Sequence, residues 1–157
     1  MVTINEIGLD KEKSMALADG LNILLADYMM FYQNTRGLHW NIKGEAFFEL
    51  HSKFEELYTS ILLKVDEIAE RILTLGATPL HSFEDYQSAA KIYAVKDVSY
   101  GKLGVQSILD ALRILIVKQR ELLVLSSDAG DEGTHALMGD YIREQEKLVW
   151  MYSAYLK

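Results

Sequence analysis

Four long stretches of this chain repeat apolar residues at intervals of three and four, and this spacing constrains the fold more than any other feature. It predicts amphipathic helices, each with one apolar stripe to bury. The chain has one proline, Pro79, and few glycines inside these stretches, so it lacks the punctuation of many short strands. The first helix is expected from about Lys11 to Arg36, with a stripe of Leu17, Leu21, Leu24, Tyr28, Phe31 and Thr35.

The remaining stretches predict three further long helices. The second is expected from about Glu45 to Leu75, with a stripe of Phe48, Phe54, Leu57, Ile61, Val65, Ile68 and Ile72. A linker with a short helix near Phe83 to Ala89 follows, and the third stripe is Leu103, Ile108, Leu112, Leu115, Gln119 and Leu122. The fourth helix is expected from about Asp131 to Leu156, through Leu137, Tyr141, Leu148, Met151 and Tyr155.

The connections between these helices predict the architecture. Short turns join the first helix to the second and the third to the fourth, whereas a long link joins the two pairs. This pattern predicts an all-α antiparallel four-helix bundle with one long crossover, which is the ferritin-like connectivity. With 157 residues, half of them apolar, the chain is expected to form a single domain over 1–157.

Composition excludes several classes of function. The absence of cysteine rules out disulfides and thiolate metal sites and favours a cytoplasmic setting. Neither a secretory leader nor a run of about 20 apolar residues is visible, so no membrane role is expected. A formal charge of -7 disfavours attraction to nucleic acid and favours small cations as partners.

A set of possible metal ligands follows the second helix. His51, Glu55, Asp66 and Glu70 fall within about 100° around the helix axis, so they share one face. His39, near the end of the first helix, can approach that face from the side. Imidazole together with carboxylate suits iron, manganese or zinc.

One chain cannot close this site. His51 and Asp66 are separated by roughly 22 Å along the helix, far more than metal ligands can span. If two copies of the second helix pack antiparallel about a two-fold axis near Ser60 and Ile61, His51 faces Glu70 of the other copy, and Glu55 faces its Asp66. The spacing therefore predicts a symmetric dimer with two equivalent metal sites.

Two other interpretations stand beside this one. A polar helix face is commonly just solvated, and paired histidines are commonly core or interface groups. A di-iron centre within one bundle would need two Glu-x-x-His motifs on separate helices, and the chain has only Glu132 to His135.

Three segments together resemble one protein family. They are GLHWNIKG at residues 37–44, FFELHSKFEELY at 47–58 and DEIAERI at 66–72, with LVWMYSAYL at 148–156 extending the likeness over nearly the whole chain. The pattern of His, His, acid, Asp and Glu at these spacings is similar to that of the Dps family, the mini-ferritins known as DNA-binding proteins from starved cells.

The resemblance implies a hollow shell of twelve subunits with iron sites shared across two-fold interfaces. His39 with Asp66 and Glu70 of a neighbouring subunit would form the tighter site, and Glu70 would bridge to a second site near His51 and Glu55. The implied activity is that of an oxidoreductase, a ferroxidase that oxidises Fe(II), preferably with hydrogen peroxide. The ferric mineral would be stored inside the shell, which protects against oxidative damage.

The resemblance also carries expectations outside the ligands. Trp40 would lie near the metal, where it reports iron binding, intercepts stray oxidant or simply packs at an interface. Asp128, Asp131, Glu132 and Asp140 lie where the family has acidic pores, although acids are also expected at a helix start.

Two rival functions remain open on the sequence alone. The chain lacks the basic tail of DNA-binding relatives, so DNA binding is expected to be weak or absent. The alternative is a nucleoid-structural DNA-binding shell that uses scattered residues such as Lys91, Lys96 and Lys102. A recognition protein or a scaffold that binds metal without turnover is the other alternative.

Overall fold

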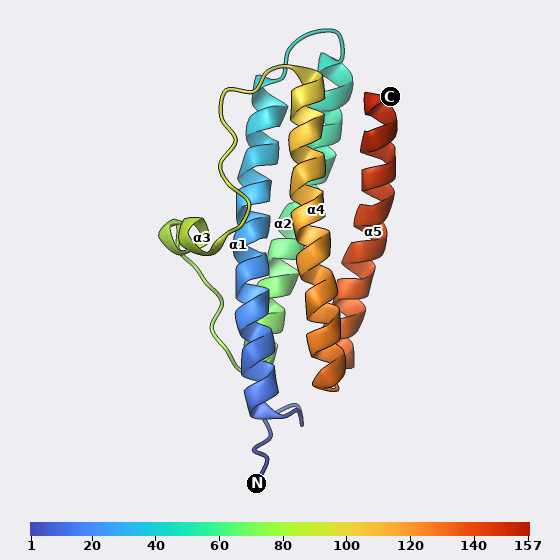
Figure 1. Ribbon diagram of the computed structural model, residues 1–157. Coiled ribbons are helices and arrows are strands. Elements are labelled where there is room, and N and C mark those ends of the chain that lie inside the picture. Colours follow the sequence, from blue (N-terminus) through green and yellow to red (C-terminus); the bar gives the residue numbers. More distant parts are fainter.

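The computed structural model describes all 157 residues, and its regular elements are helices. In chain order they are α1 (Lys11–Asn41), α2 (Phe47–Thr74), α3 (Phe83–Ala89), α4 (Gly101–Asp128) and α5 (Glu132–Leu156). Figure 1 shows α1, α2, α4 and α5 side by side along the length of the molecule, with α3 projecting beside α1. None of these helices combines the length and the apolar character that crossing a membrane requires.

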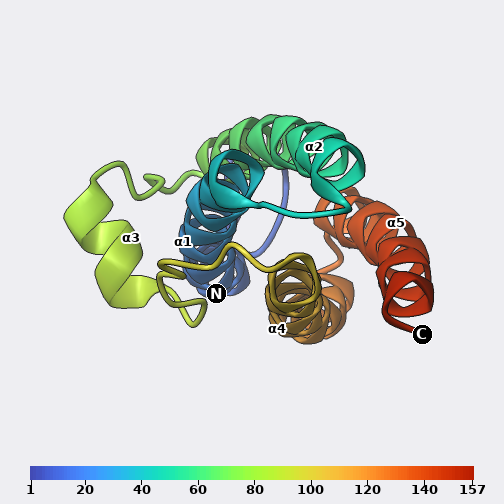
Figure 2. The ribbon, with the colours of Figure 1, turned by 90° about the horizontal axis from the view of Figure 1, so that it is seen from above.

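The four long helices form an antiparallel bundle. Seen along its axis, the bundle has α1, α2, α5 and α4 in succession around its centre, with α3 outside next to α1 (Figure 2). The link from α2 to α4 runs the full length of the molecule, and it carries α3 (Figure 1). The predicted all-α bundle with one long crossover and a short helix in it is therefore confirmed.

The first helix is longer than its apolar stripe predicts. It continues past Arg36 and Gly37 to Asn41, and the next residue, Ile42, is extended with its side chain buried in the core. The expected end at Arg36 was wrong, because a glycine lowers helix stability without forbidding the helical conformation. As a consequence, His39 and Trp40 lie in the last turn of α1.

Most residues of the predicted stripes are buried or half-buried, but four are exposed, among them Met151 at 38% and Tyr155 at 37% near the end of α5. All six stripe residues of α1 are at most 1% exposed. In contrast, Phe48 is 84% and Leu103 is 58% exposed. Phe48 precedes Phe54 by six positions and Leu103 precedes Ile108 by five, so each points about 120° to 140° away from its helix's buried face.

Polar side chains of α1 fasten the crossover to the bundle. Asn22 accepts a hydrogen bond from Leu80 N at 2.8 Å, and Asn34 accepts one from Val95 N at 3.0 Å. Between them, Asp27 Oδ1 accepts from Lys91 N at 2.6 Å and from Ile92 N at 2.9 Å. Asp27 is fully buried and its other oxygen, Oδ2, has no partner.

The Asp27 carboxyl makes stability depend on pH. Burial raises the pKa of Asp27 above its ordinary value of 3.8, against the opposing effect of the two backbone N–H donors. The folded chain therefore holds this proton to higher pH than the unfolded chain, and this contribution to stability is lost as pH rises from about 4 through the raised pKa. Asp27→Asn removes the titration and keeps an oxygen for both N–H groups. We expect the variant to gain stability relative to the wild type over that range.

Urea unfolding of both proteins at matched subunit concentration, from about pH 4 to pH 7, measures this difference. The comparison cancels the other carboxylates, which titrate equally in both chains. A difference in unfolding free energy that does not change with pH would contradict the prediction.

Charged side chains link α2 to α5 across the bundle. The Lys64 side chain is 9% exposed, and its Nζ lies 2.9 Å from Glu144 Oε2. The same ammonium donates to Ser60 Oγ at 2.8 Å. Two turns further along, in the last turn of α2, Arg71 forms a second ion pair with Asp131, the N-cap residue of α5. These two ion pairs hold one face of α2 against α5, so the opposite face of α2 lies on the outside of the bundle.

Candidate metal centre

His39 and His51 lie against each other where α1 and α2 meet. Their rings are stacked with centroids 3.8 Å apart and planes inclined by 12°. His39 is 7% exposed and belongs to the last turn of α1, whereas His51 lies in the first turns of α2. The turn between the two helices thus brings together two residues that are twelve positions apart in the sequence.

Hydrogen bonds fix the tautomer of both rings. Nδ1 of His39 lies 2.6 Å from the carbonyl oxygen of His51, and Nδ1 of His51 lies 2.7 Å from the carbonyl oxygen of His39. A carbonyl oxygen can only accept, so each Nδ1 carries the proton and donates it. In the neutral rings both Nε2 atoms therefore keep a lone pair, which is the form that binds metals.

The three carboxylates of the pattern are exposed on the outer face of α2. Glu55 follows His51 by one turn, and Asp66 and Glu70 lie further along the same helix. No group of three or more His, Asp or Glu side chains converges within the chain. The structure thus brings His39 and His51 together and leaves Asp66 and Glu70 at a distance from them.

Large apolar side chains share this outer face with the carboxylates. Leu62 is 48% exposed and Leu73 is 58% exposed, and Phe48 lies on the same side. Their directions fall within about 40° of one another around α2, among those of the acidic residues. A helix face that mixes exposed leucines with possible metal ligands is typical of a surface that another chain covers.

A cluster of aromatic rings surrounds the histidine pair. The Tyr58 ring meets His39 edge-on at 5.3 Å between centroids, and Tyr32 meets Tyr58 in the same way at 5.8 Å. Trp40 follows His39 and is 57% exposed. Arg36 places its guanidinium over the rings of Tyr32, Trp40 and Tyr58. The sequence pattern identified Trp40 but not Arg36 or Tyr58, although both lie one or two turns from a predicted ligand.

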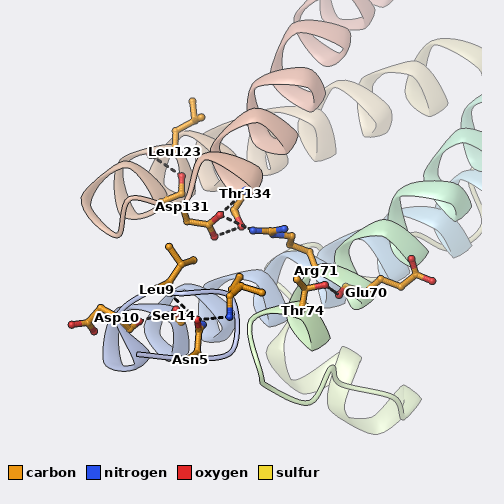
Figure 3. Close-up of polar contacts among 12 residues, drawn as sticks. Asn5, Leu9, Asp10, Ser14, Glu70, Arg71, Thr74, Leu123, Asp131 and Thr134 are labelled. Atoms are coloured by element: carbon orange, nitrogen blue, oxygen red, sulfur yellow. Dashed lines mark hydrogen bonds and ion pairs between the residues drawn. The ribbon is translucent and has the colours of Figure 1, made fainter. Parts of the chain in front are cut away.

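Arg71 and Glu70 point in different directions from the end of α2. Arg71 donates to Asp131 Oδ1 at 2.6 Å and to Thr134 Oγ1 at 2.8 Å, whereas Glu70 extends away from this ion pair (Figure 3). A Cβ atom at Gly133 would come within 2.7 Å of the Arg71 guanidinium, so the glycine allows the close approach. The ion pair therefore fixes the segment of α2 that carries Glu70.

The ion pair also changes the role expected for Asp131. Its side chain is 1% exposed, and its carboxylate caps α5 by accepting from Thr134 N. A buried carboxylate that is neutralised by Arg71 cannot line a pore. Asp128, Glu132 and Asp140 are exposed, but Asp140 pairs with Arg143 at 3.0 Å, so only the carboxylates of Asp128 and Glu132 make no ion pair within the chain.

The centre of the bundle holds hydrogen-bonded neutral groups instead of metal ligands. Tyr28 donates to Gln119 Oε1 and accepts from Gln145 Nε2, and Gln119 Nε2 donates to Gln145 Oε1. All three side chains are at most 2% exposed. Burial raises the pKa of Tyr28 far above its usual range, so the phenol stays protonated. A di-iron centre would need carboxylates in this position.

Known proteins resemble the chain over most of its length. A ferritin-like domain family matches residues 18–157. A crystal structure of a Dps protein from Vibrio cholerae O1 has 57% identity and a TM-score of 0.98, with 100% of this chain and 99% of that chain covered. That protein is described as a member of a broad superfamily of ferritin-like diiron-carboxylate proteins.

Two protein sequences extend the comparison. A Haemophilus influenzae protein is 53% identical over 148 residues, with 94% of this chain and 92% of the relative covered. A DNA protection during starvation protein from Porphyromonas gingivalis is 40% identical over 148 residues, covering 94% and 93%. The ferritin-like bundle, the helix in its crossover and the similarity to these relatives agree. The chain belongs to the Dps family.

Proposed function

We propose that this protein is a ferroxidase and iron store that oxidises Fe(II), preferably with hydrogen peroxide, and keeps the ferric mineral inside a hollow shell of twelve subunits. The outer face of α2 is the observation that carries this proposal. At one end of this face, His51 lies against His39 of α1 with both Nε2 atoms free, and Asp66 and Glu70 are exposed further along the same face. Each subunit thus offers two halves of a metal site that it does not join by itself.

A second subunit can supply the missing half. When two α2 helices pack antiparallel about a two-fold axis near Ser60, His39 and His51 face Asp66 and Glu70 of the other subunit, and Glu55 lies between them. The two nitrogen donors and three carboxylates then surround a place for two ferrous ions. Imidazole and carboxylate together hold both oxidation states of iron.

A site that holds two ferrous ions together can reduce hydrogen peroxide without releasing a hydroxyl radical. Two ferrous ions side by side donate one electron each to the same hydrogen peroxide, which is reduced to two hydroxide ions or, with protons, to water. No hydroxyl radical leaves such a two-electron step. The His39 and His51 backbone hydrogen bonds hold the rings in place, so binding iron requires no change of tautomer.

The direct test is an anaerobic Fe(II) titration followed by addition of hydrogen peroxide. We expect Trp40 fluorescence to decrease as Fe(II) is added and to level off once two ferrous ions are bound per site. After peroxide is added, we expect one hydrogen peroxide to be consumed for every two ferrous ions oxidised. Iron oxidation at the rate of a protein-free solution would overturn the proposal and would favour a scaffold without turnover. DNA is a less favoured partner, because the charge of -7 on each chain repels phosphate.

Leu62→Glu is expected to break the shell into smaller species. Leu62 is 48% exposed on the outer face of α2, close to the proposed two-fold axis. Two glutamates would meet across that axis, where like charges are destabilising. Light scattering after gel filtration measures the mass, and Leu62→Met provides the control because it stays apolar. A Leu62→Glu protein with the mass of the wild type would contradict the proposed interface.

A further inference from the structure

Arg36 stands out among the charged residues because its immediate neighbours are aromatic. Its Cζ atom lies 5.9 Å from the ring centroid of Tyr32, 5.2 Å from that of Trp40 and 5.4 Å from that of Tyr58. Its Nη1 donates a hydrogen bond to the Tyr32 hydroxyl at 2.6 Å. Three oxidisable rings thus share one guanidinium.

No carboxylate of the same chain neutralises this guanidinium. Arg36 takes part in none of the ion pairs of the chain, and its Nε is buried without a hydrogen-bond partner. Within the subunit, the positive charge is therefore balanced only by the electron-rich faces of the rings. A partly buried cation of this kind is screened less by solvent than a free surface arginine.

The same rings connect the cluster to the histidine pair. Tyr58 is in contact with both Arg36 and His39, and Trp40 is the next residue after His39. Rings this close to a site of iron oxidation are the first protein groups that a stray one-electron oxidant meets. If such an oxidant reacts with these rings, the protein itself is damaged.

A fixed positive charge makes such oxidation harder. Removing one electron from indole or phenol creates a radical cation, which a guanidinium at 5 to 6 Å repels, whereas the neutral ring is attracted. We propose that Arg36 protects Trp40, Tyr32 and Tyr58 from one-electron oxidation beside the candidate iron site. This role opposes that of a sacrificial Trp40, because Arg36 keeps the ring reduced.

The protected reaction can be written in full. A lone ferrous ion gives one electron to hydrogen peroxide, which breaks into a hydroxide ion and a hydroxyl radical. A one-electron oxidant such as this radical then takes one electron from the Trp40 indole and is itself reduced, the hydroxyl radical to hydroxide. The indole radical cation that remains releases its Nε1 proton to water. The Arg36 charge raises the free energy of the indole radical cation, which exists between the loss of the electron and the loss of the proton. The relevance to iron rests on the proposed function, but the protection itself is a property of the iron-free protein.

The test uses the iron-free assembled protein and an uncharged oxidant. The azide radical, generated by radiolysis of azide solutions, takes one electron from indole and becomes azide, so the charge of Arg36 does not alter its approach. Peptide mass spectrometry then gives the oxidised fractions of both tryptophans. Trp150 is the internal reference, because it is 68% exposed, similar to Trp40 at 57%, and has no cation over its ring.

Three variants separate charge from other effects. Arg36→Gln removes the charge, and we expect the ratio of oxidised Trp40 to oxidised Trp150 to rise about tenfold. Arg36→Lys removes the planar cover over the rings but keeps a cation, and its ratio is expected to stay near that of the wild type. Tyr32→Phe removes the hydrogen bond at Nη1 and keeps the arginine, so its ratio is also expected to be unchanged.

The outcomes divide clearly. A high ratio in Arg36→Gln with low ratios in the other two variants supports the proposal. An unchanged ratio in Arg36→Gln overturns it, as does an Arg36→Lys ratio equal to that of Arg36→Gln, because cover and not charge would then protect the ring. Iron is absent throughout, so either result stands whether or not the protein oxidises Fe(II).

Discussion

Replacing Asp66 and Glu70 together by alanine is expected to slow Fe(II) oxidation by hydrogen peroxide about a hundredfold or more, while the shell stays assembled. Loss of groups that merely orient a metal ligand already lowers affinity or activity about 10- to 100-fold, and these two residues are proposed as direct ligands. Both side chains are exposed in the isolated chain and make no ion pair within it. Their removal should therefore leave the fold of each subunit unchanged.

The control for this experiment removes the same charge elsewhere. Glu12 and Asp19 are exposed acids on α1 that also make no ion pair, so Glu12→Ala with Asp19→Ala matches the loss of two negative charges. We expect that variant to oxidise iron at the wild-type rate. Peroxide consumption in stopped flow, with the mass of each assembly measured in parallel, provides the comparison. Equal rates in the two double variants would defeat the proposed ligand set.

Arg71→Ala is expected to lower the free energy of unfolding by about 3 kcal/mol, because it leaves the Asp131 carboxylate buried without its cation. The Asp131 side chain is 1% exposed and lies 2.6 Å from Arg71 Nη2. Its two remaining donors are the backbone N–H and the hydroxyl of Thr134, which do not carry a charge. Chemical denaturation at a fixed subunit concentration measures the loss.

A double variant tests whether the buried charge is the cause. Asp131→Ser keeps a cap for α5, because a serine oxygen can also accept from Thr134 N, and it removes the carboxylate. We therefore expect Arg71→Ala combined with Asp131→Ser to be more stable than Arg71→Ala alone. If the double variant is the less stable of the two, packing of the arginine stem and not the ion pair holds α2 against α5.

The helices and their order were accessible from the sequence because apolar periodicity reports directly on burial. The stripe of α1 and the bounds of α3 at Phe83–Ala89 match the prediction. The errors arose where periodicity is weak. Gly37 did not end α1, and the outward-pointing Phe48 was assigned to the buried stripe of α2. Helix ends and single apolar residues depend on tertiary contacts that a spacing rule does not contain.

The candidate site was accessible only in outline. Spacing along α2 placed His51, Glu55, Asp66 and Glu70 on one face, and the structure adds the reciprocal hydrogen bonds between His39 and His51. Those bonds join a side chain of each helix to the backbone of the other, so no single-helix pattern predicts them. The burial of Asp131 was hidden for the same reason, because its partner, Arg71, is sixty positions away.

The Tyr28, Gln119 and Gln145 network at the middle of the bundle has a consequence for how the subunit handles its cargo. Because these neutral side chains satisfy one another, the bundle needs no ion to hold its helices together. For the iron store proposed above, we therefore expect iron loading and release to be independent of folding, so that a chelator removes the iron without unfolding the subunit.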